Sequence, residues 1–143
     1  MVSKGLRDHG WTFGCPIEQL DDFTLNLLSN DEVIAINQDP LGKAGRLVLE
    51  EDDVQVWLKP LEDGSFAMCL FNIAGYGKTP ESYFRWGDEL QKVFTLCLDN
   101  IGLNGSYVMR DVWPQKNIVE FSGSFQTNIP YHGVILLKFI PIK

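Results

Sequence analysis

The sequence predicts a mainly β fold, an antiparallel Greek-key β-sandwich of about eight strands that follows a short N-terminal helical segment. Two observations predict it. Apolar residues recur at three- and four-residue spacings up to about residue 42, and from about Gly45 the period changes to two. Eight short apolar runs then alternate with turn signals, without an intervening helical pattern, which is typical of antiparallel sandwiches and barrels. We therefore divide the chain into a helical segment, 1–42, and a β-sandwich domain, 43–143.

The helical segment contains two predicted helices. The apolar residues on one face of the first are Ile17, Leu20, Phe23, Leu27 and Leu28. The second spans Asp31 to Asn37, where Ser29 or Asn30 can cap its start. Pro40 and Gly42 then end the helical pattern.

The sandwich domain contains the predicted strands. These are Arg46–Glu50, Val54–Pro60, Ser65–Asn72, Leu90–Asp99, Ser106–Trp113, Ile118–Phe121, Ser124–Ile129 and Gly133–Ile140. The runs 66–71 and 134–137 are apolar on both faces, so we expect them to be central strands whose second face is covered by loops or by the helices. Residues 75–87 form the longest irregular stretch and are predicted to be a flexible loop.

Length and charge exclude several classes of protein. The 143 residues suffice for one domain with a sizeable core, whereas a (β/α)₈ barrel needs roughly 200 or more. A net charge of −7 argues against binding to nucleic acid, because phosphates require a basic surface. There is neither an apolar run long enough to span a membrane nor a signal-peptide pattern. We expect no nucleic-acid or membrane partner and, by default, a cytoplasmic chain.

Few residues have the pattern of a catalytic or metal site. The acidic run 50–53 lacks the spacing of a calcium loop and is predicted to be a solvated turn. The three cysteines, Cys15, Cys69 and Cys97, lack a CxxC pair and are predicted to be buried thiols. We therefore predict no metal site and no cofactor.

The two histidines, His9 and His132, lie in no nucleophile motif, and His132 is predicted to be a turn or packing residue. The tripeptide Asn104-Gly105-Ser106 fits a glycosylation sequon, but Asn-Gly is also a tight-turn signal, which we favour.

Aromatic residues are candidates for contact with carbohydrate. Trp57, Trp86 and Trp113 could stack on sugar rings, although indoles at alternating strand positions usually pack in the core or at an edge. Arg110 and Asp111 beside Trp113 could grip a sugar, but we favour a simple Arg–Asp pair next to a half-buried aromatic side chain.

Residues 27–42, which read LLSNDEVIAINQDPLG, resemble the last helical segment of the catalytic barrel in the α-galactosidase (melibiase) and α-N-acetylgalactosaminidase family of glycoside hydrolases. The following residues are similar, in order, to that family's C-terminal antiparallel β domain. The matching pieces are 56–64, 70–72, 110–113 and 130–137. The resemblance covers roughly residues 14–143. Residues 5–13, GLRDHGWTF, resemble instead the segment that enters an early barrel strand, so the sequence resembles the family's beginning joined to its end, with most of the barrel missing.

The absence of most of the barrel from the resemblance bears on whether the chain can catalyse hydrolysis. A retaining glycosidase needs two carboxyl groups about 5–5.5 Å apart. In the resembled family both belong to aspartates on barrel strands, and the nucleophile follows Lys-Tyr, a context that does not occur here. Asp8, Asp39 and Asp111 match other positions of the family. We therefore assign no catalytic residue to the chain.

The leading hypothesis is a non-catalytic β-sandwich with a structural or interaction role. The alternative is a galactoside- or other carbohydrate-binding module, and an active α-galactosidase is less favoured. Exposing an apolar helix face would cost about 1.5–3 kcal/mol per side chain. We therefore expect the helices to fold onto the sandwich, or two chains to form a homodimer through Leu20, Phe23, Leu27 and Leu28.

Overall fold

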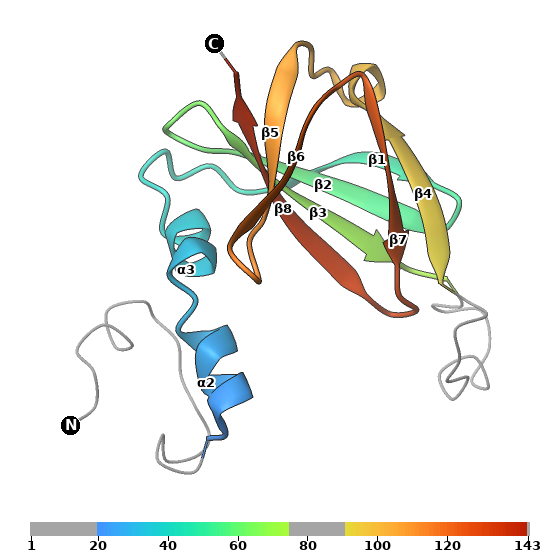
Figure 1. The fold of residues 1–143 in the computed structure, drawn as a ribbon. Coiled ribbons are helices and arrows are strands. Elements are labelled where there is room, and N and C mark those ends of the chain that lie inside the picture. The colour runs from blue at the N-terminus through green and yellow to red at the C-terminus, as the bar shows by residue number, and fades with distance from the viewer. Residues whose placement is uncertain (1–19, 75–90, 143) are drawn as a thin grey trace.

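The computed structural model describes residues 20–74 and 91–142 (Figure 1). Two short helices, α2 (Asp22–Leu28) and α3 (Asp31–Asn37), precede the strands. The strands are β1 (Arg46–Glu51), β2 (Val54–Pro60), β3 (Phe66–Asn72), β4 (Lys92–Cys97), β5 (Ser106–Asp111), β6 (Lys116–Ser122), β7 (Ser124–Ile129) and β8 (Val134–Pro141). A 3₁₀ turn, η4 (Leu98–Ile101), follows β4. The predicted loop 75–87 and the residues His9, Cys15, Ile17 and Trp86 lie outside the described residues.

The strands form two antiparallel sheets that pack face to face. One has six strands in the order β1-β2-β3-β8-β5-β6, and the other pairs β4 with β7. The predicted mainly β antiparallel fold is therefore confirmed. The bounds of β2 and β7 are as predicted, whereas β4 is shorter than expected because residues 98–101 turn into η4.

The core lies between the inner faces of the two sheets. Its fully buried members from the large sheet include Val54, Val56, Met68, Leu70 and Phe139, and those from the small sheet include Leu96 and Ile129. The Phe139 ring centroid lies 5.7 Å from that of Phe125 on the facing sheet, and the two rings pack edge to face. The alternating inward residues of β2 and β3 thus supply the apolar burial that stabilises the sandwich.

Helix α3 covers one end of the outer face of the large sheet. Ile36 packs with Leu61, Ala67 and Val112 in a second, smaller apolar cluster. The strands β3 and β8 lie at the centre of the sheet, as their apolar sequences predict, and α3 covers part of their second face. In contrast, α2 buries no residue and its Phe23 is 72% exposed. Of the two helices, α3 therefore folds onto the sandwich and α2 does not.

The acidic run is a turn, as predicted. Asp52 and Asp53 have φ angles of 52° and 61° and connect β1 to β2. Two consecutive residues with positive φ are typical of the type I′ turn that best matches the twist of a hairpin. Asp53 also lies 3.6 Å from the Lys92 ammonium.

Candidate functional site

The outer face of the large sheet carries a row of apolar side chains that crosses four strands. Direct cross-strand partners point to the same face of a sheet. Register places Leu47, Trp57, Cys69 and Leu136 opposite one another on β1, β2, β3 and β8. We call this set, together with Phe71 of the next row, the outer apolar face.

Part of this face is open to solvent. Trp57 and Phe71 are 36% and 37% exposed, and Leu47 is 43% exposed. A sheet with one solvated face ordinarily places polar residues outward. Contiguous exposed apolar surface of this kind instead marks interaction sites on protein surfaces. The outer apolar face is therefore the candidate functional site.

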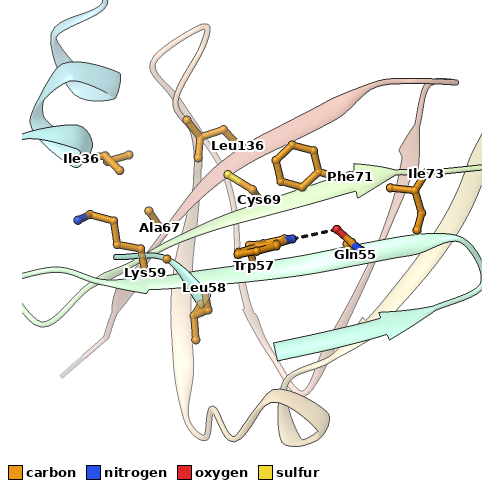
Figure 2. A pocket seen from close by; sticks show the side chains of 11 residues that line it. Ile36, Gln55, Trp57, Leu58, Lys59, Ala67, Cys69, Phe71, Ile73 and Leu136 are labelled. Atoms are coloured by element: carbon orange, nitrogen blue, oxygen red, sulfur yellow. Dashed lines mark hydrogen bonds between the residues drawn. The ribbon is translucent and has the colours of Figure 1, made fainter. Parts of the chain in front are cut away.

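A concave cavity of about 500 Å³ is lined in part by Trp57. Figure 2 shows Trp57, Cys69 and Phe71 on one side of strands β2 and β3, while Leu58 points to the opposite side, into the core. Ile36 of α3 bounds the cavity at one end. The helix that covers part of the sheet thus also forms a wall of the cavity.

One hydrogen bond at the rim orients the indole, and further polar pairs lie around it. The Trp57 Nε1 donates to Gln55 Oε1 at 3.2 Å, and Gln55 Nε2 donates to Glu50 Oε2 at 2.7 Å. On the other side of the ring, Lys59 Nζ donates to the Lys43 carbonyl oxygen at 2.6 Å. An apolar centre with a hydrogen-bonded rim is the anatomy of protein interfaces, and the oriented indole is a suitable anchor.

The thiol in this face contributes packing rather than reactivity. Burial raises the pKa of Cys69 above its ordinary value. Because the thiolate is the reactive form, a raised pKa keeps this side chain a neutral, weakly polar group at neutral pH.

The predicted Arg110–Asp111 pair is wrong. Successive residues of a strand point to opposite faces, and Arg110 instead reaches α3, where its Nε donates to Glu32 Oε2 at 2.8 Å. Its Nη1 also donates to Asn117 Oδ1 at 2.9 Å. The hydrogen bond to Glu32 raises the pKa of Arg110. The Asp111 carboxylate accepts from the Trp113 backbone N–H at 3.2 Å, so Asp111 supports the turn after β5, whereas Arg110 connects β5 to α3.

The predicted carbohydrate contacts are separated in the structure. Trp57 lines the cavity described above, whereas Trp113 is 39% exposed at the turn between β5 and β6 and does not line it. His132 has a φ of 53° and its ring packs at 4.0 Å, centroid to centroid, on Tyr131, in agreement with its predicted role in a turn. Phe71 belongs to the run 66–71 that is apolar on both faces, and pairing the strands in register places it on the same face as Trp57.

Two of the aspartates that match the resembled family, Asp39 and Asp111, have structural partners, and Asp8 lies outside the described residues. The Asp39 carboxylate accepts from the backbone N–H groups of Leu41 and Glu62 at 3.1 and 3.2 Å. In residues 20–74 and 91–142, no group of three or more His, Cys, Asp or Glu side chains is arranged to hold a metal ion. Within the same residues, no helix is long and apolar enough to cross a membrane.

The fold and this face define a small antiparallel β-sandwich domain with an outer surface suited to protein contact. The chain belongs to the family of α-galactosidase C-terminal β-sandwich domains, whose model matches residues 51–139. It is 37% identical over 134 residues to a Dictyostelium discoideum protein named "Probable alpha-galactosidase" and 35% identical to alpha-galactosidase 3 of Arabidopsis thaliana, with 90% of this chain covered in each case.

The solved structure of α-galactosidase I from Mortierella vinacea has the same fold, with a TM-score of 0.72 and 26% identity over 90% of this chain. The chain spans 31% of that structure, 31% of the Dictyostelium relative and 28% of the Arabidopsis relative. It therefore corresponds to the C-terminal part of these larger proteins.

Proposed function

We propose that this chain is a non-catalytic structural domain whose outer apolar face packs against the catalytic domain of an α-galactosidase. The observation that carries the proposal is the apolar row centred on Trp57, which remains partly exposed on a sheet that is otherwise well packed. The relatives are α-galactosidases about three times as long as this chain, so a catalytic domain is the partner that the family offers. The role is to stabilise that domain by burying apolar surface.

Binding to a separately prepared catalytic domain tests this proposal. The domain can be taken from the Dictyostelium relative, without its own C-terminal part, and titrated by calorimetry. We expect saturable binding and a raised melting temperature for the mixture. Truncation of a central interface tryptophan costs about 2 kcal/mol or more, so Trp57→Ala should weaken binding about thirtyfold.

Trp113→Ala is the matched control, because Trp113 is equally exposed but lies outside the cavity. Its affinity should stay within about twofold of the unchanged chain. Absence of binding at tens of micromolar, or equal losses in the two variants, would contradict the proposal.

Lack of catalysis is the second part of the proposal. It is supported by the share of the relatives that the chain covers and by the structural hydrogen bonds of Asp39. Purified chain should not hydrolyse a nitrophenyl α-galactoside above the buffer rate, and turnover that survives repeated purification would overturn this part.

Carbohydrate binding is a second candidate function, favoured by one arrangement. The Trp57 ring lies beside the Gln55 amide at the edge of a concave cavity, and an aromatic plane with adjacent hydrogen-bonding groups suits a sugar ring. Titration with galactose and melibiose should then change tryptophan fluorescence in a saturable manner, and Trp57→Ala should abolish the change. No response up to millimolar sugar would exclude it.

A homodimer is the third proposal, and it uses a different surface. The residues are Leu20, Phe23, Leu27 and Leu28; Phe23 and Leu27 are 72% and 37% exposed. Burial of this face between two copies would remove it from water. Sedimentation equilibrium should show a concentration-dependent dimer that Phe23→Ser disrupts, and a monomer at all concentrations would refute it.

A further inference from the structure

The loop between η4 and β5 carries an asparagine in an N-glycosylation motif. Asn104-Gly105-Ser106 is the single Asn-x-Ser/Thr tripeptide of the chain, and all three residues are exposed. Two hydrogen bonds at these positions engage backbone carbonyl oxygens: the Asn104 oxygen accepts from the Tyr107 hydroxyl, and the Ser106 oxygen accepts from the Ile142 N–H. The asparagine amide and the serine hydroxyl, which the acceptor motif requires, are therefore both accessible.

The backbone of this loop has a defined turn conformation, and its side chains are exposed to solvent. Gly105 has a φ of 105°, which L residues rarely adopt, and Tyr107 donates its hydroxyl hydrogen to the Asn104 carbonyl oxygen at 3.0 Å. Tyr107 itself is buried in the core. The turn interpretation of Asn-Gly and the sequon interpretation are thus compatible, because the turn is what presents the asparagine side chain to solvent.

We propose that Asn104 is the acceptor for an N-linked oligosaccharide. In this reaction the Asn104 Nδ2 forms a bond to C1 of a sugar carried on a lipid-linked diphosphate, the C1–O bond breaks, the lipid diphosphate leaves and the amide loses one proton. The attached glycan is bulky and hydrophilic, so it requires a surface position. N-linked glycosylation takes place in the secretory pathway. A glycan on Asn104 would therefore mean that the chain enters this pathway, contrary to the default expectation of a cytoplasmic chain.

The position of the loop leaves the outer apolar face free. Figure 1 shows that the loop between η4 and β5 lies at the end of the sandwich away from α2 and α3. None of the residues that line the Trp57 cavity comes from 98–106. A glycan on Asn104 is therefore compatible with docking, and this inference stands or falls independently of the proposed function.

Treatment of the chain purified from its own organism with an amide-cleaving peptide N-glycosidase tests the modification. We expect a heterogeneous species that collapses to a single lighter band after this treatment, with Asn104 converted to aspartate that carries one heavy oxygen when the digest is run in heavy-oxygen water. A chain whose Asn104 peptide carries only unmodified asparagine overturns the proposal.

Variants secreted from a eukaryotic host assign the residue. Asn104→Gln and Ser106→Ala should lose the mobility shift completely, whereas Ser106→Thr should keep it, because threonine also satisfies the motif. Asn100→Gln is the matched control, since Asn100 is exposed nearby but lies in no sequon, and it should retain the shift. Circular dichroism of each variant confirms folding. A shift that persists in Asn104→Gln overturns the assignment.

Discussion

Asn30 joins the helical segment to the sheet, and its replacement tests how firmly α3 is held. The residue is 8% exposed. Its Oδ1 accepts from the backbone N–H groups of Glu32 and Val33, each at 3.1 Å, and so caps α3. Its Nδ2 donates to the carbonyl oxygens of Val112 and Trp113 at 3.0 and 3.3 Å, more than eighty residues away. One amide therefore links the start of α3 to the end of β5.

The expected cost of Asn30→Ala has two parts. Loss of an N-cap costs about 1 kcal/mol. Loss of the donor to the buried Val112 carbonyl leaves that oxygen without a partner, which costs about 1–3 kcal/mol. The free energy of unfolding should thus fall by about 2–4 kcal/mol. Asn30→Asp keeps the cap but sets a carboxylate oxygen against the Val112 and Trp113 carbonyl oxygens, so it should cost at least as much as the loss of the donor alone.

Urea unfolding and hydrogen exchange together measure this effect. Asn30→Ala should lower the urea midpoint and speed amide exchange in α3, and Asn30→Asp should also lower the midpoint although it keeps the cap. Asp21→Ala is the control, because the Asp21 carboxylate caps α2 through an exposed, local bond to the Thr24 N–H at 2.6 Å. It should speed exchange in α2 alone. A midpoint shift no larger for Asn30→Ala than for Asp21→Ala would refute the reasoning.

Three further predictions concern other parts of the fold. The hydrogen bond from Lys138 lowers the pKa of Asp63 to about 2 from 3.8. The stability it contributes is complete above about pH 4 and is lost as the pH falls toward 2, so Asp63→Asn should flatten the melting temperature over that window. Leu70→Ala removes a fully buried side chain and should cost about 2–5 kcal/mol in urea unfolding, whereas Leu47→Ala should change it by less than about 1 kcal/mol. Gly133→Ala should lower the melting temperature, because its Cβ would lie 2.8 Å from a backbone carbonyl oxygen; an unchanged melting temperature would show that this corner can shift.

The strands were predictable because their signals are local. Alternation of apolar residues and the turn residues between runs place β2 and β7 at their observed bounds. The central position of β3 and β8 also follows from sequence, because a strand that is apolar on both faces needs cover on both sides.

The partners of charged and capping residues were not predictable, because they depend on contacts between distant segments. Arg110 has an acidic neighbour in sequence, yet its partner is Glu32, 78 residues away. Similarly, the apolar spacing of the first predicted helix suggests packing as strongly as that of the second. Between the two helices of the described residues, α3 is the one whose start is joined to a distant segment, through the Asn30 amide. It is also the one that packs on the sheet.

The candidate site was predictable from the sequence in part. Period-two alternation identifies Trp57 and Phe71 as outward residues once their inward neighbours are assigned to the core. Sequence alone then predicts that Phe71 is covered, because it belongs to a run that is apolar on both faces, whereas Trp57 is predicted to pack in the core or at an edge. The structure shows that α3 covers only the end near Ala67 and leaves the indole partly exposed. An outward tryptophan whose ring is already oriented by a hydrogen bond to Gln55 loses less conformational entropy when a partner covers it. That preorganisation favours a protein surface as the occupant over continued exposure to water.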